Sequence, residues 1–288
     1  MPGGLDHIVH AVRDLDAAAA AYRGLGFTVG ARNRHPWGTH NVIVQLPGFF
    51  VELLTIGEPE KITQPAGRQF SFGAFTREFL AGREGFSMLV LESRDAAADA
   101  AGYERSGFGG FDVFDFERAG RRPDGAAVKL AFSLAFAIDP KSPSSGFFAC
   151  QQHFPENFWN PAFQAHRNTA SGVAGVVLVA ENPSDHHIFL SAYTGLRDLR
   201  ATSSGVAVTT PRGEIQIMDP AAFHLRFGVE PPADAAGARI AALRIAVGDM
   251  TMLGTVLRES GVATESRMGA AIVRPQDAMG ATIVFEPG

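Results

Sequence analysis

The chain has a single cysteine, Cys150, among its 288 residues. One cysteine excludes an intramolecular disulfide and is typical of a protein from a reducing compartment. Lys and Arg form no basic run and the formal net charge is −5, so we expect no nucleic-acid partner. The longest apolar runs, such as Val173 to Ala180, are far shorter than the ~20 residues that cross a bilayer. The first residues also lack the cationic and apolar segments of a signal peptide, and we therefore expect a cytoplasmic protein with no membrane partner.

Several catalytic signatures are missing as well. The sequence has no glycine-rich dinucleotide or phosphate loop, no HExxH motif and no GxSxG nucleophile elbow. Phenylalanine, in contrast, is abundant, with 23 residues against 3 Tyr and 2 Trp. Because Phe supplies apolar area without a polar handle, this composition predicts a phenylalanine-packed core and leaves a phenylalanine-lined pocket as the alternative.

A short motif occurs twice and indicates an internal repeat. The segment Ala21-Tyr-Arg-Gly-Leu25 returns as Ala192-Tyr-Thr-Gly-Leu196, each time closing a predicted helix that follows a strand-like apolar run. Two further strand-then-helix starts lie near Phe86 and Ile240, and three short strands follow each of the four helices. His186 and His187 fall early in the third of these helices, where we expect them on its surface. The predicted unit is therefore strand, helix and three strands, used four times.

The predicted fold class is α+β, with four βαβββ modules that pair because a lone module leaves a sheet face and its edges exposed. Modules one and two form a predicted domain over residues 1–156, with an insertion at 58–85 that carries a short helix around Phe75 to Leu80. Residues 157–170 are a predicted linker, because strand alternation stops there. Residues 171–288 are a second, degenerate domain that supports the first or mediates a homodimer.

Four segments of the first module carry a resemblance to a known superfamily. They are Leu5-Asp-His-Ile-Val-His-Ala-Val-Arg-Asp14, Tyr22-Arg-Gly-Leu-Gly-Phe27, Gly38-Thr-His-Asn41 and Phe50-Val-Glu-Leu53. With the module order, they resemble the glyoxalase/bleomycin-resistance/extradiol-dioxygenase (vicinal oxygen chelate) superfamily. Within it the chain looks like the glyoxalase-like domain group, whose last strand contains Cys-Gln followed by Pro-Glu and Trp, here Cys150-Gln-Gln-His-Phe-Pro-Glu-Asn-Phe-Trp159.

The resemblance covers roughly residues 5 to 165, and the C-terminal half matches by module order and by the repeated motif. It implies two glyoxalase-like domains, each with a U-shaped sheet around a cavity. In metal-using members a divalent ion sits in that cavity, held by a residue on the first strand of a module and a Glu on its last strand. His7 and Glu52 stand at those positions.

The residues themselves give a parallel reason to single out this pair. Strand alternation puts His7 and Val9 on one face of their strand and Asp6 and Ile8 on the other. Glu52 lies in the apolar strand Phe49-Phe-Val-Glu-Leu-Leu54, where burying a carboxylate without a partner is costly. A metal ion, an arginine or water would resolve that cost, and His plus carboxylate is normal ligation for a divalent ion such as Mn, Fe, Ni or Zn.

Two ligands do not complete a catalytic metal site, which usually takes three protein ligands. When the second module is aligned with the first, Ser87 or a neighbour takes the position that corresponds to His7. Cys150 takes the position that corresponds to Glu52, and Gln152 lies on the same face of that strand. Gln152 is therefore the third predicted metal ligand, through its carbonyl oxygen. This set departs from the two-His, two-Glu pattern of the superfamily. The aligned positions of the C-terminal half, such as Gly175 and Gln216, predict no second metal centre.

Other residues are predicted to meet a substrate. His35 and His40 flank Pro36-Trp37-Gly38-Thr39, a loop that we expect at the cavity mouth, so His35, Trp37 and His40 are predicted substrate contacts. Cys150 and His153 of the second module are also predicted substrate contacts. The alternative for Cys150 is a buried thiol that packs like a small apolar side chain. The alternative for His153 is a side chain on the opposite face of the strand, unless a bulge intervenes.

Three functions remain open at this point. The first is an enzyme of lyase, isomerase or dioxygenase type, in which a metal on His7 and Glu52 stabilises a substrate oxyanion and Glu52 also acts as a base. The second is a metal-free module that sequesters a small apolar molecule in a cleft lined by Phe and Trp. The third is a scaffold with a vestigial cavity. A small-molecule partner is common to the first two.

Overall fold

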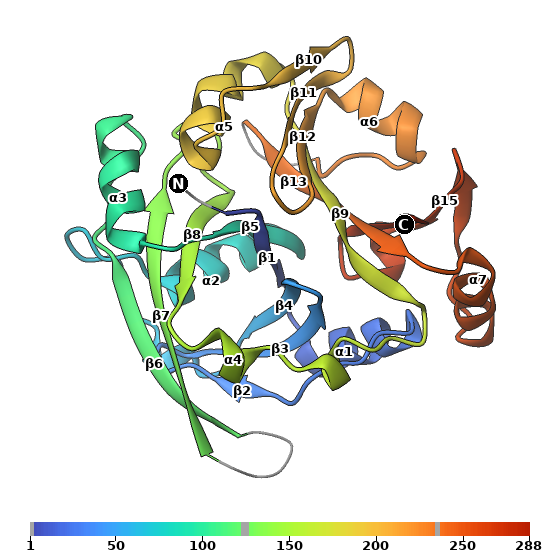
Figure 1. Ribbon diagram of the computed structural model, residues 1–288, viewed down its shortest axis with the longest axis horizontal. Helices are drawn as coiled ribbons and strands as arrows, with labels where there is room; N and C mark the ends of the chain where they lie inside the picture. The colour runs from blue at the N-terminus through green and yellow to red at the C-terminus, as the bar shows by residue number, and fades with distance from the viewer. Residues whose placement is uncertain (1–2, 122–126, 234–236) are drawn as a thin grey trace.

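The computed structural model describes residues 3–121, 127–233 and 237–288 (Figure 1). Residues 1, 2 and 122–126, which belong to the predicted N-terminal domain, and residues 234–236 lie outside this description. Within it, no helix is long and apolar enough to cross a membrane.

The N-terminal half contains the first two modules and the insertion between them. Its elements are β1 (Leu5–Ala11), α1 (Leu15–Gly24), β2 (Asn33–Arg34), β3 (Thr39–Leu46), β4 (Phe49–Ile56), the 3₁₀ turn η1 (Pro59–Lys61), α2 (Phe72–Gly82), β5 (Gly85–Glu92), α3 (Ala96–Arg105), β6 (Phe114–Arg121), β7 (Ala127–Ala137) and β8 (Gly146–Gln152). The strands form one sheet in the order β2-β3-β4-β1-β5-β8-β7-β6. The two modules therefore pair through their first strands, β1 and β5, at the centre of a curled sheet.

The C-terminal half repeats this arrangement. After α4 (Pro155–Phe158) and η2 (Pro161–Phe163) come β9 (Ala170–Val179), η3 (Pro183–His186), α5 (His187–Thr194), β10 (Arg200–Thr202), β11 (Gly205–Thr209), β12 (Glu214–Met218), α6 (Pro220–Phe227), β13 (Arg239–Val247), α7 (Met250–Glu259), β14 (Glu265–Arg267), β15 (Ala270–Val273), η4 (Pro275–Asp277) and β16 (Thr282–Pro287). The strand order β10-β11-β12-β9-β13-β16-β15-β14 is the order of the first sheet. The α+β class with paired βαβββ modules is confirmed, whereas the exact domain boundaries stay a prediction.

Local chemistry explains where the module helices begin. The carboxylates of Asp14, Asp95 and Asp249 accept hydrogen bonds from backbone N–H groups in the first turns of α1, α3 and α7. These N–H groups have no partner inside the helix, so a capping Asp fixes the start of each one. The same strand-to-helix step is therefore encoded in three of the four modules by the same residue type.

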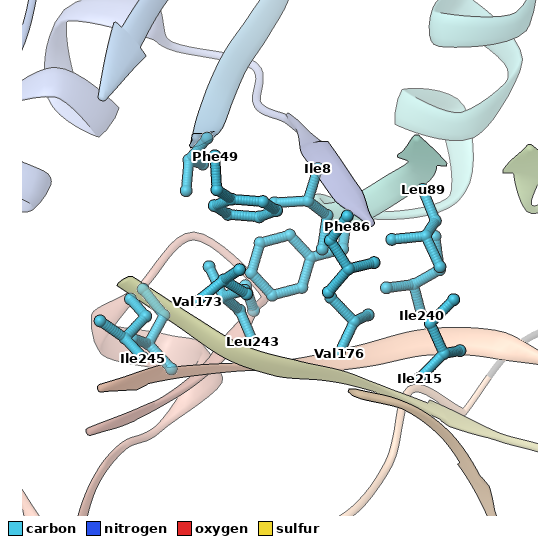
Figure 2. Close-up of a cluster of buried hydrophobic side chains, with 14 of the residues drawn as sticks. Ile8, Phe49, Phe86, Leu89, Val173, Val176, Ile215, Ile240, Leu243 and Ile245 are labelled. Carbon is cyan, nitrogen blue, oxygen red and sulfur yellow. The ribbon is translucent and has the colours of Figure 1, made fainter. Parts of the chain in front are cut away.

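The main core lies between the two sheets. Figure 2 shows Ile8, Phe49, Phe86 and Leu89 of the first sheet packed against Val173, Val176, Ile240 and Leu243 of the second. The apolar faces of α1, α3, α5 and α7 join the same cluster. Because the outer faces of both sheets are covered in this way, their concave faces remain for other contacts.

The two concave faces are filled differently. In the C-terminal half, Phe223 and Phe227 of α6 pack into the concave face against Val177 and Val179 of β9. In the N-terminal half, Phe72 of α2 and Phe158 of α4 lie at the edges of a cluster that leaves a cavity. The chain thus keeps one open concave face, in the half that contains His7 and Glu52.

Candidate active site

A cavity of about 60 Å³, room for several water molecules, opens on the concave face of the first sheet. Seven Phe and Trp side chains line it: Trp37, Phe50, Phe72, Phe116, Phe132, Phe148 and Phe158. The polar side chains of the wall include His7, His35, Glu52 and Arg118, which can exchange protons or hold charge, and the neutral amide of Asn41. This is the pattern of a small-molecule site, apolar with a few polar groups.

His7 lies on the central strand of the sheet and is backed by a carboxylate. Its Nδ1 lies 2.6 Å from Asp6 Oδ2, and Asp6 Oδ1 accepts a hydrogen bond of 3.0 Å from Gln152 Nε2. The ring stacks on Phe50 with a centroid distance of 4.2 Å. Because Nδ1–H donates to the Asp6 carboxylate, Nε2 is the ring nitrogen left for other contacts.

The expectation that Asp6 points away from His7 is wrong, and a bulge is the reason. Along β1 and β5, Leu5 pairs with Leu91 but His7 pairs with Val90, so the register shifts between Leu5 and His7. Such a shift breaks the alternation of side chains, and the Asp6 carboxylate can bond the His7 ring beside it. The hydroxyl of Ser87, the residue that module alignment matches with His7, bonds the Val9 carbonyl and does not line the cavity.

A chain of hydrogen bonds leads from Arg118 to Glu52. Arg118 Nη1 donates to Asn33 Oδ1 at 3.0 Å, Asn33 Nδ2 donates to Asn41 Oδ1 at 2.9 Å, and Asn41 Nδ2 donates to Glu52 Oε1 at 2.5 Å. This chain joins β6 to β2, the two edge strands of the sheet, and so closes the curl over the cavity. The carboxylate that looked unpartnered in its apolar strand is therefore satisfied by an amide.

His35 extends the polar group at this end of the cavity. Its Nδ1 lies 2.8 Å from Thr39 Oγ1, its Nε2 lies 3.4 Å from Asn41 Nδ2, and the ring stacks on Trp37. Burial lowers the pKa of His35, although the nearby Glu52 carboxylate opposes that shift. A neutral ring fits the hydrogen bonds, with Nδ1–H donating to Thr39 and Nε2 accepting from Asn41.

Burial also shifts the pKa values of two other groups in the wall. It lowers the pKa of the Arg118 guanidinium, with Glu52 acting in the opposite direction. It raises the pKa of the Cys150 thiol well above its usual value, and the Asp6 and Glu52 carboxylates add to that rise. This rise in the pKa disfavours the thiolate, the form in which a cysteine acts as a nucleophile.

The predicted site residues do not all meet in this cavity. His7, Glu52, His35, Trp37 and Cys150 line it. Gln152 bonds Asp6 behind His7 instead, and its Oε1 is buried without a partner among the described residues.

Two predicted substrate contacts lie away from the cavity wall. His40 points to the opposite side of β3 from Asn41 and bonds Glu58. His153 follows the end of β8 and bonds the Ser133 hydroxyl, exposed to solvent. Alternation explains both, since His40 is one position from the cavity residue Asn41 and His153 is three positions from the cavity residue Cys150.

Sequence reasoning missed Asp6, Asn41 and Arg118. Arg118 had a signal: it stands in phase with Phe114 and Phe116 along β6, so alternation places a cation on an apolar face. Asn41 is likewise in phase with Thr39 and Ile43, both of which line the cavity. Asp6 had no such signal, because the bulge that turns it depends on pairing with the second module.

The side chains present do not fit a protein-held catalytic ion. Among the described residues, no three His, Cys, Asp or Glu side chains come together as a possible metal site. His7 and Glu52 are not directly paired where β1 and β4 run side by side. His7 pairs with Phe50 and Glu52 pairs with Val9, so the two candidate ligands are offset along the strands. The second module lines the cavity with Cys150 but, among the described residues, with no His, Asp or Glu side chain that could add a donor.

Comparison with known proteins places this geometry in a family. The profile described as "Glyoxalase-like domain" matches residues 5–194, more than half of the chain, and the chain therefore belongs to that family. No curated protein sequence matches it significantly.

Solved structures share the fold at low sequence identity. A hypothetical protein from Staphylococcus aureus is 15% identical, with 99% of each chain covered and a TM-score of 0.67. A mutant of 4-hydroxymandelate synthase from Streptomyces coelicolor is 11% identical, covering 100% of this chain and 93% of its own, with a TM-score of 0.56. A xylose isomerase-like TIM barrel/4-hydroxyphenylpyruvate dioxygenase fusion protein is 10% identical over 99% of this chain and 48% of its own, with a TM-score of 0.55. These likenesses show a common fold.

Proposed function

We propose that this protein binds a small, flat, mainly apolar molecule in the cavity of its first sheet, without a metal ion. The observation that carries the proposal is the cavity wall, in which aromatic rings surround a few polar groups gathered near Glu52 and Arg118. Flat rings offer large contact area with little conformational entropy to lose. Trp37 adds a specific group: its Nε1 is buried and has no acceptor among the described residues, a need that an oxygen of a bound molecule would meet.

Filling the cavity tests this proposal. Ile43 is partly buried and lines both the cavity and a wider groove beside it, so Ile43→Phe places a ring where a ligand would lie. We expect this variant to bind naphthalene-1-carboxamide, a flat neutral probe, at least about tenfold more weakly than the unchanged protein, measured by calorimetry.

The matched control for this experiment is Ile188→Phe, because Ile188 is 61% exposed on α5. It should leave the affinity unchanged. Equal binding by both variants, or no binding by the unchanged protein to this probe, would count against a ligand in this cavity.

The metal-dependent lyase, isomerase or dioxygenase that the resemblance implies is the second candidate, and one contact favours it. Metal-binding histidines commonly donate their second ring N–H to a carboxylate, and Asp6 holds His7 in this way. Such a site would still need donors beyond His7 and Glu52.

Metal content separates the two candidates. We expect mass spectrometry of untagged protein to find Mn, Fe, Ni and Zn well below one ion per chain, because the described side chains offer too few donors. Near-stoichiometric metal that disappears in both His7→Ala and Glu52→Ala would instead establish the second candidate. His187→Ala, an exposed histidine on α5, serves as the control variant.

A further inference from the structure

Arg118 lies where two spaces meet. It lines the aromatic cavity and also a wide groove of about 600 Å³ beside it, together with Ile43 and Phe158. The groove has a more polar wall, to which Asn33, Gln45 and Asn160 contribute. A molecule that reaches from the groove into the cavity must therefore pass the guanidinium.

The guanidinium is held in place but its charge is unpaired. Arg118 donates from Nη1 to Asn33, and no carboxylate of the described residues forms an ion pair with it. A guanidinium has five N–H donors in a planar fork, so most of its hydrogen-bonding capacity is unused. It is half-buried, and a partly desolvated cation without a counterion is a costly feature that an anion would relieve.

Glu52 does not serve as that counterion directly. Asn33 and Asn41 stand between the two groups in the hydrogen-bond chain, and Glu52 lines the cavity but not the groove. The groove side of Arg118 is thus the place for an outside anion, away from the Glu52 charge.

We propose that Arg118 binds the carboxylate of a small amphipathic monoanion whose apolar body lies in the aromatic cavity. This inference rests on the proposed function and names its ligand class. The guanidinium fork matches a carboxylate in a bidentate way. One negative charge fits better than the two of a phosphate monoester, because Glu52 on the cavity side and Glu156 in the groove wall both repel added charge.

Paired probes test the charge of the ligand. Naphthalene-1-carboxylate and naphthalene-1-carboxamide differ in charge but hardly in shape. We expect the unchanged protein to bind the carboxylate about 10- to 100-fold more tightly, as a charge-assisted hydrogen bond would give. Arg118→Met should abolish this preference while it retains binding of the amide, and Arg118→Lys should keep part of the preference.

Two further variants sharpen the result. Glu52→Gln keeps an acceptor for Asn41 but removes the repelling charge, so the carboxylate should bind a few-fold more tightly and the amide equally well. Arg94→Met, an exposed arginine that lines neither space, should change nothing. If Arg118→Met lowers thermal stability, the role of Arg118 is judged from two other results. These are the ratio of carboxylate to amide affinity in the unchanged protein and the same ratio in Arg118→Lys.

The outcomes distinguish this inference from the proposed function. Equal affinity for the two probes, or a carboxylate preference that survives in Arg118→Met, overturns the role of Arg118 and leaves the cavity as a binding site. Failure to bind either probe overturns both. A preference lost in Arg118→Met and increased in Glu52→Gln supports the monoanion.

Discussion

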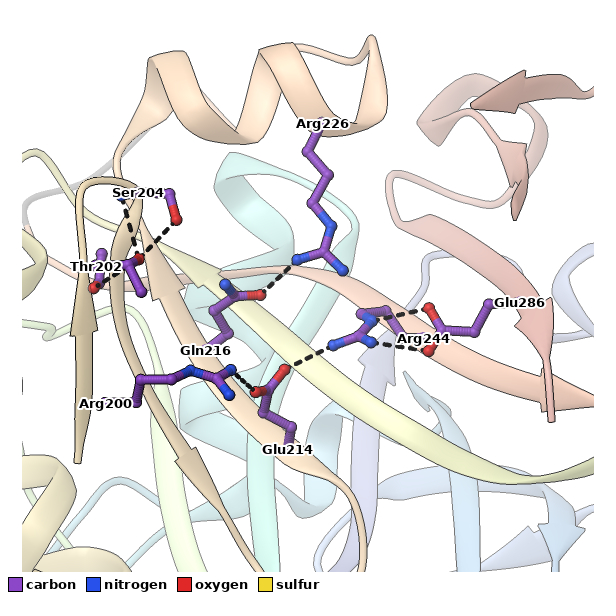
Figure 3. Close-up of polar contacts among 9 residues, drawn as sticks. Arg200, Thr202, Ser204, Glu214, Gln216, Arg226, Arg244 and Glu286 are labelled. Atoms are coloured by element: carbon purple, nitrogen blue, oxygen red, sulfur yellow. Dashed lines mark hydrogen bonds and ion pairs between the residues drawn. The ribbon is translucent and has the colours of Figure 1, made fainter. Parts of the chain in front are cut away.

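Replacing Arg244 by methionine is expected to lower the free energy of unfolding by about 3 kcal/mol. Figure 3 shows Arg244 between two carboxylates, with Nε and Nη2 donating to Glu286 and Nη1 donating to Glu214 at 2.8 Å. The Arg244 side chain is only 13% exposed. Its removal would leave the partly buried Glu286 without its ion-pair partner and Glu214 with only the exposed Arg200, and that is more costly than the loss of the ion pairs alone.

Arg200 provides the matched control. It donates to the other oxygen of the same Glu214, but its side chain is 64% exposed. Exposed ion pairs contribute about 0–1 kcal/mol, so Arg200→Met should have a small effect in urea denaturation. Comparable losses in both variants would contradict the argument from burial.

A rescue experiment identifies the cause of the loss. Adding Glu214→Gln and Glu286→Gln to Arg244→Met removes the stranded charges, and we expect most of the lost stability to return. A triple variant as unstable as Arg244→Met would mean that Arg244 acts through packing of its aliphatic stem instead.

This ion-pair cluster occupies the second sheet at the place that corresponds to the floor of the cavity in the first. Glu214 of β12 pairs with Gly175 of β9 in the second sheet, just as Phe50 of β4 pairs with His7 of β1 in the first sheet. A side chain at Gly175 has little room, because an added Cβ would lie 2.6 Å from the Glu214 carbonyl oxygen. With α6 packed over the same face, ion pairs and Phe rings fill the second concave face where the first is hollow.

The repeat explains why the fold could be predicted from the sequence. The module helices follow strands at similar spacing, and the expected helix in the insertion is present as α2. Helix α6 was missed although its ends are well marked: Asp219 caps its start, Pro220 is its first residue and Gly228 ends it in the left-handed conformation. It stands between β12 and β13, as α2 stands between β4 and β5, so a comparison of the two halves could have indicated it.

The candidate site was less predictable because its contacts cross between modules. Glu52 could be recognised as a carboxylate in an apolar strand, where it is half-buried, but its partner Asn41 and the distant Arg118 depend on how the sheet curls. His186, expected on a helix surface, is instead buried and bonds Asp139 at 2.7 Å. Alternation and periodicity decide which face a residue takes, whereas its partner on another module depends on tertiary packing.

Acid is expected to destabilise the protein through His10, by about 2–3 kcal/mol between pH 7 and pH 4.5. His10 is completely buried on β1, where Nδ1 meets the Tyr22 hydroxyl and Nε2 meets the Met279 carbonyl of the C-terminal half. Burial lowers the pKa of His10 to about 4; the bond to Met279 opposes this shift and the charge of Arg83 adds to it.

The direction of this pH dependence follows from when His10 takes up a proton in the unfolded chain and in the folded protein. The unfolded chain takes up a proton at His10 below its ordinary pKa of 6.5, whereas the folded protein resists protonation until about pH 4. The contribution of His10 to the free energy of unfolding is therefore fully present above pH 6.5 and is lost as the pH falls towards 4. His35 and His166, whose pKa values burial also lowers, change stability in the same direction.

Urea denaturation at a series of pH values measures this dependence. His10→Gln, which does not titrate, should be less stable at pH 7 because it replaces a well-packed ring, but its stability should fall less steeply below pH 6.5. His187→Gln, at an exposed histidine on α5, should keep the wild-type slope. A His10→Gln slope equal to that of the wild type would assign the acid sensitivity to other groups. A shallower slope would mean that protonation of the buried His10 ring, disfavoured by its burial, accounts for part of the loss of stability in acid.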